Sequence, residues 1–226
     1  MKGFPFIFFI AVVFSACNKY THFDGPNAYE DNFETYTSFD ELILPYPEQD
    51  VNWSFTQLTK PTNKIYLDTT FSHSGEHALL FEASPTDSDG ASKASINKQN
   101  MAFWEGEKIR ISAWYYIAGD LDLNWLFLAD LEEQTAVGAG PGMRLVLVDN
   151  QLRDEYKFNE KDIVQPEGKE IDFPRNEWVE IIWEVELSQK ATGSVKLWQN
   201  QQLIISTKDN VTLPNDILYV QQGTKG

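Results

Sequence analysis

The stretch RNEWVEIIWEVELSQKATGSVKLWQNQQLI, residues 175–204, decides the fold of this chain. From 178 to 187 every second residue is apolar, and alternation with a period of two predicts a half-buried β-strand. The apolar face consists of Val179, Ile181, Trp183, Val185 and Leu187. A second alternating run follows at 194–199, after a short segment with Gly193, so the two runs predict an antiparallel hairpin.

The register of this hairpin follows from its apolar faces, which must coincide. Val185 must face Val195 or Leu197, because a slip of one residue would turn the whole apolar set toward solvent. Either register places Lys196 opposite Glu184 or Glu186, an exposed pair worth about 0.2–1 kcal/mol. We therefore expect this charged pair to have a structural role.

The same alternation recurs along the chain and predicts further strands. In KIRISAWYYIAG the predicted core residues are Ile109, Ile111, Ala113, Tyr115 and Ile117, with Arg110, Ser112, Trp114 and Tyr116 on the other face. In NWLFLADLE the predicted faces are Trp125, Phe127, Ala129 and Leu131 against Leu126, Leu128, Asp130 and Glu132. In MRLVLV, Met143, Leu145 and Leu147 oppose Arg144, Val146 and Val148. Shorter strands are expected in KIYLDT, HALLFEAS and ASKASIN, at 64–69, 77–84 and 91–97. Many short strands separated by turns predict an all-β fold, an antiparallel β-sandwich, for residues 31–226.

The first 17 residues, MKGFPFIFFIAVVFSAC, predict an exported protein. Their apolar run is shorter than the roughly 20 residues that a membrane-spanning helix needs, and it suits the h-region of a signal peptide. Small residues followed by Cys17 resemble the lipobox of bacterial lipoproteins, although Phe14 departs from the usual Leu or Val. We expect residues 1–16 to be a signal peptide, Cys17 to be lipidated and 17–30 to be a tether. The alternative is an ordinary signal peptide with a chance cysteine.

The charge of the chain limits its partners. The formal net charge is −16, and removal of residues 1–16 with Lys2 would leave −16 − 1 = −17. Phosphate binding needs a basic surface, so this charge disfavours broad contact with nucleic acid or with anionic lipid head groups. We expect contact with the outer membrane through the lipid anchor only, on a leaflet that the sequence leaves open.

Four blocks carry a resemblance to a known fold family: DNFETY, SHSGEHALLFEAS, EGEKIRISAWYYI and the stretch 175–204. They resemble the concanavalin A-like jelly rolls of polysaccharide-degrading bacteria, especially the Bacteroidota. The last block is similar to laminin G-like lectin domains and to polysaccharide lyases of the heparin lyase I and alginate lyase kind. The resemblance implies a jelly roll over about 31–222. Such domains commonly end in a further strand, and this chain stops at QQGTKG, so we expect a missing final strand or a sheet completed differently.

The resemblance leaves three functions open. The first is an envelope protein that binds polysaccharide without cleaving it, because aromatic side chains stack on sugar rings. Its predicted glycan contacts lie on one concave face and are Trp114, Tyr116, Arg110, Arg144, Asp130 and Glu132. The second is a lyase that cleaves uronic-acid glycans by β-elimination, with Tyr116, Arg144 and Lys157 as its catalytic residues. The third is a structural envelope lipoprotein without a glycan ligand. A missing His-Tyr-Arg cluster weighs against catalysis, since a general base must lie within hydrogen-bond reach of its proton.

One segment has the composition of a calcium loop. Asp87 and Asp89 alternate before Gly90, and oxygen ligands at alternate positions suit Ca²⁺. Related jelly rolls often hold one structural Ca²⁺ with a ligand from the first strand, so Glu34 is a third candidate ligand. The alternative is a plain β-turn. No other cofactor is expected.

Overall fold

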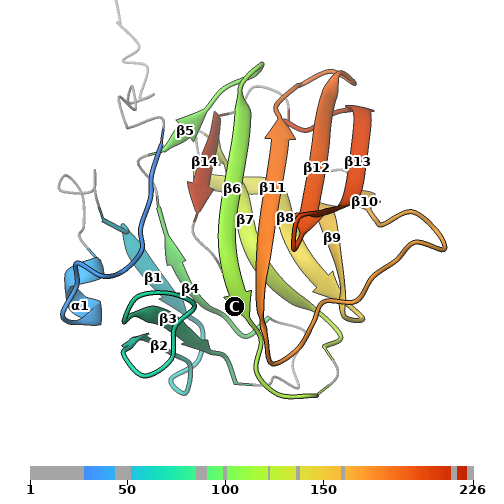
Figure 1. Cartoon of the computed structure of the whole chain (residues 1–226). Coiled ribbons are helices and arrows are strands. Elements are labelled where there is room, and N and C mark those ends of the chain that lie inside the picture. The colour runs from blue at the N-terminus through green and yellow to red at the C-terminus, as the bar shows by residue number, and fades with distance from the viewer. Residues whose placement is uncertain are drawn as a thin grey trace, which may run out of the picture.

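The computed structural model describes residues 28–43, 52–84, 91–98, 101–121, 123–135, 138–158, 161–214 and 218–222. Two antiparallel sheets lie face to face, and a smaller N-terminal part lies beside them (Figure 1). The predicted antiparallel β-sandwich is therefore confirmed. Cys17, Asp87 and Asp89 lie outside the described residues.

The first sheet contains the strands formed by residues 175–204. Its order is β13-β12-β11-β6. The strands are β6 (Lys108–Tyr116), β11 (Trp178–Glu186), β12 (Gly193–Gln199) and β13 (Gln202–Asn210). Val185 faces Val195 and Glu184 faces Lys196, so one of the two predicted registers is confirmed.

The second sheet has six strands in the order β10-β9-β8-β7-β14-β5. The strands are β5 (Ala102–Phe103), β7 (Leu126–Thr135), β8 (Gly138–Val148), β9 (Gln151–Tyr156), β10 (Lys161–Ile163) and β14 (Leu218–Gln222). Strand β14, near the end of the chain, was not predicted, and it pairs with both β7 and β5.

The N-terminal part consists of a short helix and two strand pairs. The helix is α1 (Phe39–Leu42), and the pairs are β1 (Phe55–Leu58) with β4 (Ala94–Asn97) and β2 (Lys64–Asp68) with β3 (Ala78–Glu82). The three short strands predicted in this region correspond to β2, β3 and β4. Leu42, Ile65 and Ile96 lie at the centre of a small second core.

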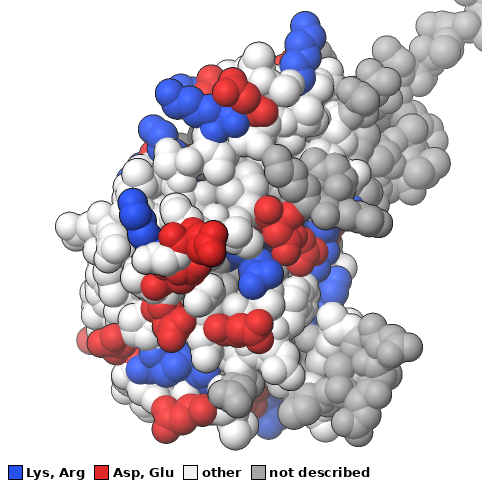
Figure 2. All heavy atoms as spheres, turned by 90° about the vertical axis from the view of Figure 1, so that its right-hand side faces the viewer, with Lys and Arg blue, Asp and Glu red and all other residues white. Residues whose placement is uncertain are grey.

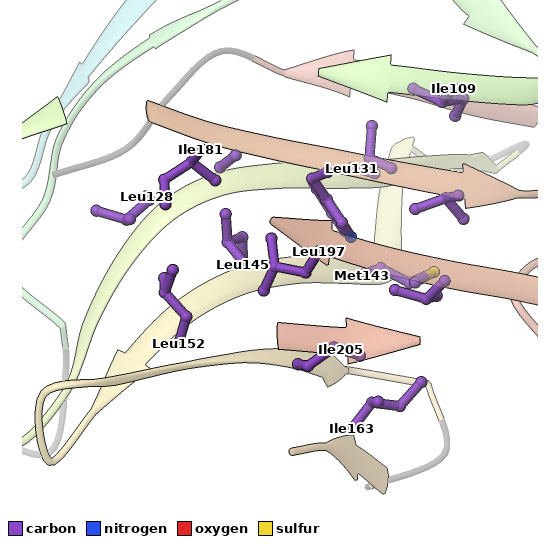
Figure 3. Packing of buried hydrophobic residues seen from close by; sticks show 14 of the residues in the cluster. Ile109, Leu128, Leu131, Met143, Leu145, Leu152, Ile163, Ile181, Leu197 and Ile205 are labelled. Carbon is purple, nitrogen blue, oxygen red and sulfur yellow. The ribbon is translucent and has the colours of Figure 1, made fainter. Parts of the chain in front are cut away.

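The main core lies between the two sheets. Leu145 and Leu152 of the six-stranded sheet point toward Ile181 and Leu197 of the other sheet (Figure 3). Burial alternates strictly along β11, as predicted. Because the inner faces are mostly apolar, most polar residues of the two sheets lie on two outer faces that point in opposite directions.

A β-bulge in β7 overturns one predicted face. Phe127 pairs with Val146 and Ala129 pairs with the adjacent Leu145, so Leu128 is an extra residue. An extra residue disrupts the alternation of a strand. Ala129 and Leu131 therefore join the core between the sheets, whereas Phe127 is buried on the other face of its sheet, against Arg144. The predicted common face of Phe127, Ala129 and Leu131 is wrong for this reason.

Across the parts of the chain that the structure describes, no helix is long and apolar enough to cross a membrane.

Candidate active site

The predicted site residues divide between the two outer faces. Arg110, Trp114 and Tyr116 belong to β6 in the four-stranded sheet. The others belong to the six-stranded sheet or follow one of its strands, and they are Asp130, Glu132, Arg144 and Lys157. The expectation of one shared face is therefore wrong. Alternation predicts which residues avoid the core, but it does not say which sheet a strand joins.

Three charged residues form a row across the outer face of the six-stranded sheet. Asp130 of β7, Arg144 of β8 and Glu155 of β9 are direct register partners. Arg144 Nε lies 3.5 Å from Glu155 Oε1, and its side chain is 21% exposed. An arginine guanidinium presents several N–H donors in a planar fork, which suits a carboxylate. Its fixed position therefore makes Arg144 a candidate site for an anionic group.

Lys157 lies just beyond this row and contacts two carboxylates. Its Nζ is 2.7 Å from Asp130 Oδ1 and 3.6 Å from Glu132 Oε1. Only 11% of the Lys157 side chain is exposed, and Asp130 is buried. The two carboxylates restrict the position of the Lys157 side chain. This face thus holds two ordered cations.

Trp125 adds an aromatic surface to the cations. The indole is 39% exposed, and its Nε1 donates a hydrogen bond of 3.3 Å to Glu155 Oε2. The Arg144 guanidinium lies 5.5 Å from the Trp125 ring centre and 5.6 Å from that of Phe127. Glu155 therefore contacts both the arginine and the tryptophan. A ring for stacking beside a cation for a carboxylate suits an acidic sugar.

The strongly acidic overall charge is not gathered into one patch on the side of the molecule seen in Figure 2. There the Asp and Glu side chains are interleaved with Lys and Arg. Arg153 of β9, for example, lies 3.5 Å from Asp162. On this side the net charge of −16 therefore forms no continuous acidic surface.

Sequence reasoning missed Trp125 and Glu155 as members of this site. Trp125 was grouped on one face with Phe127, Ala129 and Leu131, because the bulge at Leu128 is invisible in the alternation. One sequence signal fits the structure. Arg144 directly follows the core residue Met143, so alternation places the Arg144 side chain on the outer face. Glu155 becomes recognisable only from its register with Arg144.

Tyr116 lies on the opposite side of the sandwich from Arg144. Its ring contacts Phe71, 4.6 Å away between ring centres, and Trp178 at 5.6 Å. Arg110, further along the same strand, is ion-paired with Glu184. Tyr116 therefore cannot act together with Arg144 and Lys157 on one bound sugar.

Glu34 has a structural role in this fold. Its carboxylate accepts hydrogen bonds from the backbone N–H groups of Glu76 and His77, with Oε1 at 3.0 Å from each. Gly75 has a φ of +70°, and a Cβ at that position would collide with Glu34 Oε1. Within the described ranges, no group of three or more His, Cys, Asp or Glu residues could hold a metal ion.

Comparisons with known proteins identify the family and the fold of the chain. A family model described as polysaccharide lyase matches residues 50–224. An endo-β-1,4-glucuronan lyase from the fungus Trichoderma reesei is 13% identical, with 76% of this chain and 79% of that chain covered and a TM-score of 0.62. Cellulose induced protein, Cip1, is 14% identical, with 77% and 92% covered and a TM-score of 0.52. At these identities the two structures support the fold alone. No curated protein matches the chain.

Proposed function

The chain belongs to the polysaccharide lyase family, and we propose that it cleaves a uronic-acid polysaccharide by β-elimination on the outer face of the six-stranded sheet. One observation carries this proposal: Arg144 is held beside the exposed ring of Trp125, with Lys157 next to the same row. Family membership favours the lyase over the non-catalytic binding protein. It gives no support to the sequence-based expectation that the chain lacks a catalytic cluster.

The first requirement of β-elimination is a weaker negative charge on the uronate carboxylate. Neutralising this carboxylate makes the C5 proton of the sugar more acidic. Arg144 would supply the positive charge that neutralises the carboxylate, because its guanidinium is already oriented by Glu155. Groups oriented before the reaction need no rearrangement during it, which is the main source of electrostatic catalysis.

The second requirement is transfer of two protons. A base removes the C5 proton, the C4–O bond breaks as the C4–C5 double bond forms, and the leaving oxygen takes up a proton. Lys157 would donate the second proton, since its Nζ is held beside the charged row by Asp130 and Glu132. Glu132 is its partly exposed neighbour and would accept the first proton.

Trp125 would position the sugar ring. Its exposed indole can stack on the C–H face of a pyranose, and Glu155 holds both this indole and Arg144. Loss of the ring should therefore raise KM more than it lowers kcat.

The test uses glucuronan, alginate and heparin as substrates and follows the ultraviolet absorbance of the unsaturated uronate. Arg144→Ala should lower kcat/KM by about 100-fold or more, as expected when one stabilising group of a transition state is lost. The matched control is Arg110→Ala, which removes another glutamate-paired arginine from the opposite face and should keep full activity. Absence of product from all three polymers, or equal activity of the two variants, would remove the site from this face.

We also propose that lipidation of Cys17 anchors the protein to the outer membrane. The support for this proposal is the sequence of residues 1–17 alone.

A further inference from the structure

A second aromatic surface lies on the opposite side of the sandwich from the candidate active site. It combines Phe71 and His73, from the loop between β2 and β3, with residues of the four-stranded sheet. We call it the Trp114 patch, and its members are Phe71, His73, Trp114, Tyr116 and Trp178. His73 stacks on Trp114 with 3.8 Å between ring centres and 15° between ring planes. Phe71 stacks on Trp178 at 5.5 Å.

Packing alone does not account for this patch. The rings hold the loop against β6 and β11, yet 44% of Phe71 and 43% of Trp114 remain exposed. Ring contacts that served only to fasten the loop could be made by smaller or fully covered side chains. Several exposed aromatic rings gathered on one surface are typical of a binding site.

The charges around the patch indicate which ligand it suits. Glu180 is the register partner of Trp114, so a carboxylate lies beside the indole. Both cations of β6, Lys108 and Arg110, are ion-paired with glutamates of β11. An anionic polymer would meet these carboxylates, whereas an uncharged sugar could stack on the rings and accept or donate hydrogen bonds at their edges.

We infer that the Trp114 patch is a second, non-catalytic glycan-binding site that takes an uncharged polysaccharide. The patch and the candidate active site lie on the two outer faces of one sandwich. The protein can therefore hold a neutral glycan on one face while the other face remains open to an acidic one. This inference does not depend on lyase activity.

The test is affinity electrophoresis in native gels that contain hydroxyethyl cellulose, xylan or mannan, with alginate as the anionic comparison. We expect retardation by at least one neutral polymer. Trp114→Ala and Phe71→Ala should each weaken it about tenfold, the size expected when the burial of one aromatic ring is lost. Phe71 lies in a loop, so its variant tests the patch even if Trp114→Ala unfolds the sheet. Trp104→Ala removes an exposed tryptophan that belongs to neither site, so it is the matched control and should be retarded like the parent protein.

Three outcomes would overturn the inference. They are migration unaffected by every neutral polymer, equal retardation of all variants, and a Trp114-dependent dimer in size-exclusion chromatography, which would make the patch a contact between two copies. The lyase assay separates this inference from the proposed function. Trp114→Ala should cleave uronan at the parent rate, and binding of neutral glycan should persist in Arg144→Ala.

Discussion

Asp154 is a carboxylic acid that the chain buries between its two sheets. The residue lies on β9 and is fully buried, and its Oδ2 accepts a hydrogen bond of 3.3 Å from Trp183 Nε1. Among the residues that the structure describes, Oδ1 has no hydrogen-bond partner. Burial raises the pKa of this carboxyl well above its ordinary value, with a smaller opposing effect from the Trp183 hydrogen bond.

This raised pKa predicts a pH-dependent stability. The folded protein keeps the Asp154 proton while the unfolded chain releases it above about pH 4, so the free energy of unfolding should fall as pH rises from there toward the folded pKa. Asp154→Asn keeps the acceptor for Trp183 and cannot ionise, so it should be more stable than the parent at pH 8. Urea unfolding at pH 5 and pH 8 measures this. A gap between variant and parent that does not widen with pH would contradict the prediction.

The Lys157–Asp130 pair should contribute to stability as well as to chemistry. Lys157→Met removes the ammonium 2.7 Å from a buried carboxylate, and breaking a buried pair by removing one partner costs about 3 kcal/mol. A second change, Asp130→Asn, removes the carboxylate charge and should restore part of that loss. Chemical denaturation of the parent, the two single variants and the double variant gives the coupling energy. Additive effects of the two changes would mean that the pair contributes nothing.

At the scale of single elements, the hairpin between β12 and β13 has an unfavourable backbone conformation at its two-residue turn. Asn200 and Gln201 have φ angles of 47° and 65°, in the left-handed region. Two-residue hairpin turns of this kind favour Asn followed by Gly. Glycine has no Cβ, so it adopts a positive φ without a steric cost.

Gln201→Gly should therefore stabilise the protein by about 1 kcal/mol, because Gln201 is the non-glycine residue at the second position of the turn. The melting temperature measures this gain. The reverse experiment is Asn200→Val, which places a β-branched side chain in the same region and should destabilise the turn. A lower melting temperature for Gln201→Gly would show that entropy of the unfolded chain outweighs the relief of strain.

The sequence predicts the strands of the sandwich better than it predicts the site. Alternation identified β6, β8, β11 and β12 with their inward faces, since a strand buried on one side imposes that pattern on its residues. It missed β14, which is short and opens with consecutive apolar residues, so it shows no alternation. It also failed along β7, where the extra residue Leu128 changes the face of everything that follows.

The site was predicted only in pieces, because its residues come together through pairing between strands. Arg144, Asp130, Glu132 and Lys157 were recognised as candidates, and the structure brings these four together. Arg110, Trp114 and Tyr116 were grouped with them, yet they lie on the other sheet. The order of strands within a sheet depends on contacts far apart in the sequence, which local alternation does not encode.

At the scale of the whole molecule, anchoring through Cys17 remains a prediction from the sequence. If Cys17 carries lipid, the full-length protein should fractionate with membranes, and Cys17→Ser should release it into the soluble fraction. Acyl chains contribute about 0.8 kcal/mol per buried CH₂ group, so the difference should be nearly complete. Metabolic labelling with a fatty acid gives an independent measurement. Equal membrane association of both proteins would rule out the anchor.

The extra residue in β7 separates that strand into two halves that are out of phase. Deleting Leu128 would restore regular alternation beyond Phe127. Phe127 and Ala129 would become neighbours opposite Val146 and Leu145, so Asp130 would stay opposite Arg144 and Leu131 would stay in the core. A one-residue deletion at this point should therefore remove the bulge and leave the acidic side of the candidate site in place. In an alignment of related chains, a gap at position 128 would be compatible with this site, whereas a gap at one of the positions that follow it in β7 would turn part of the strand to the other face.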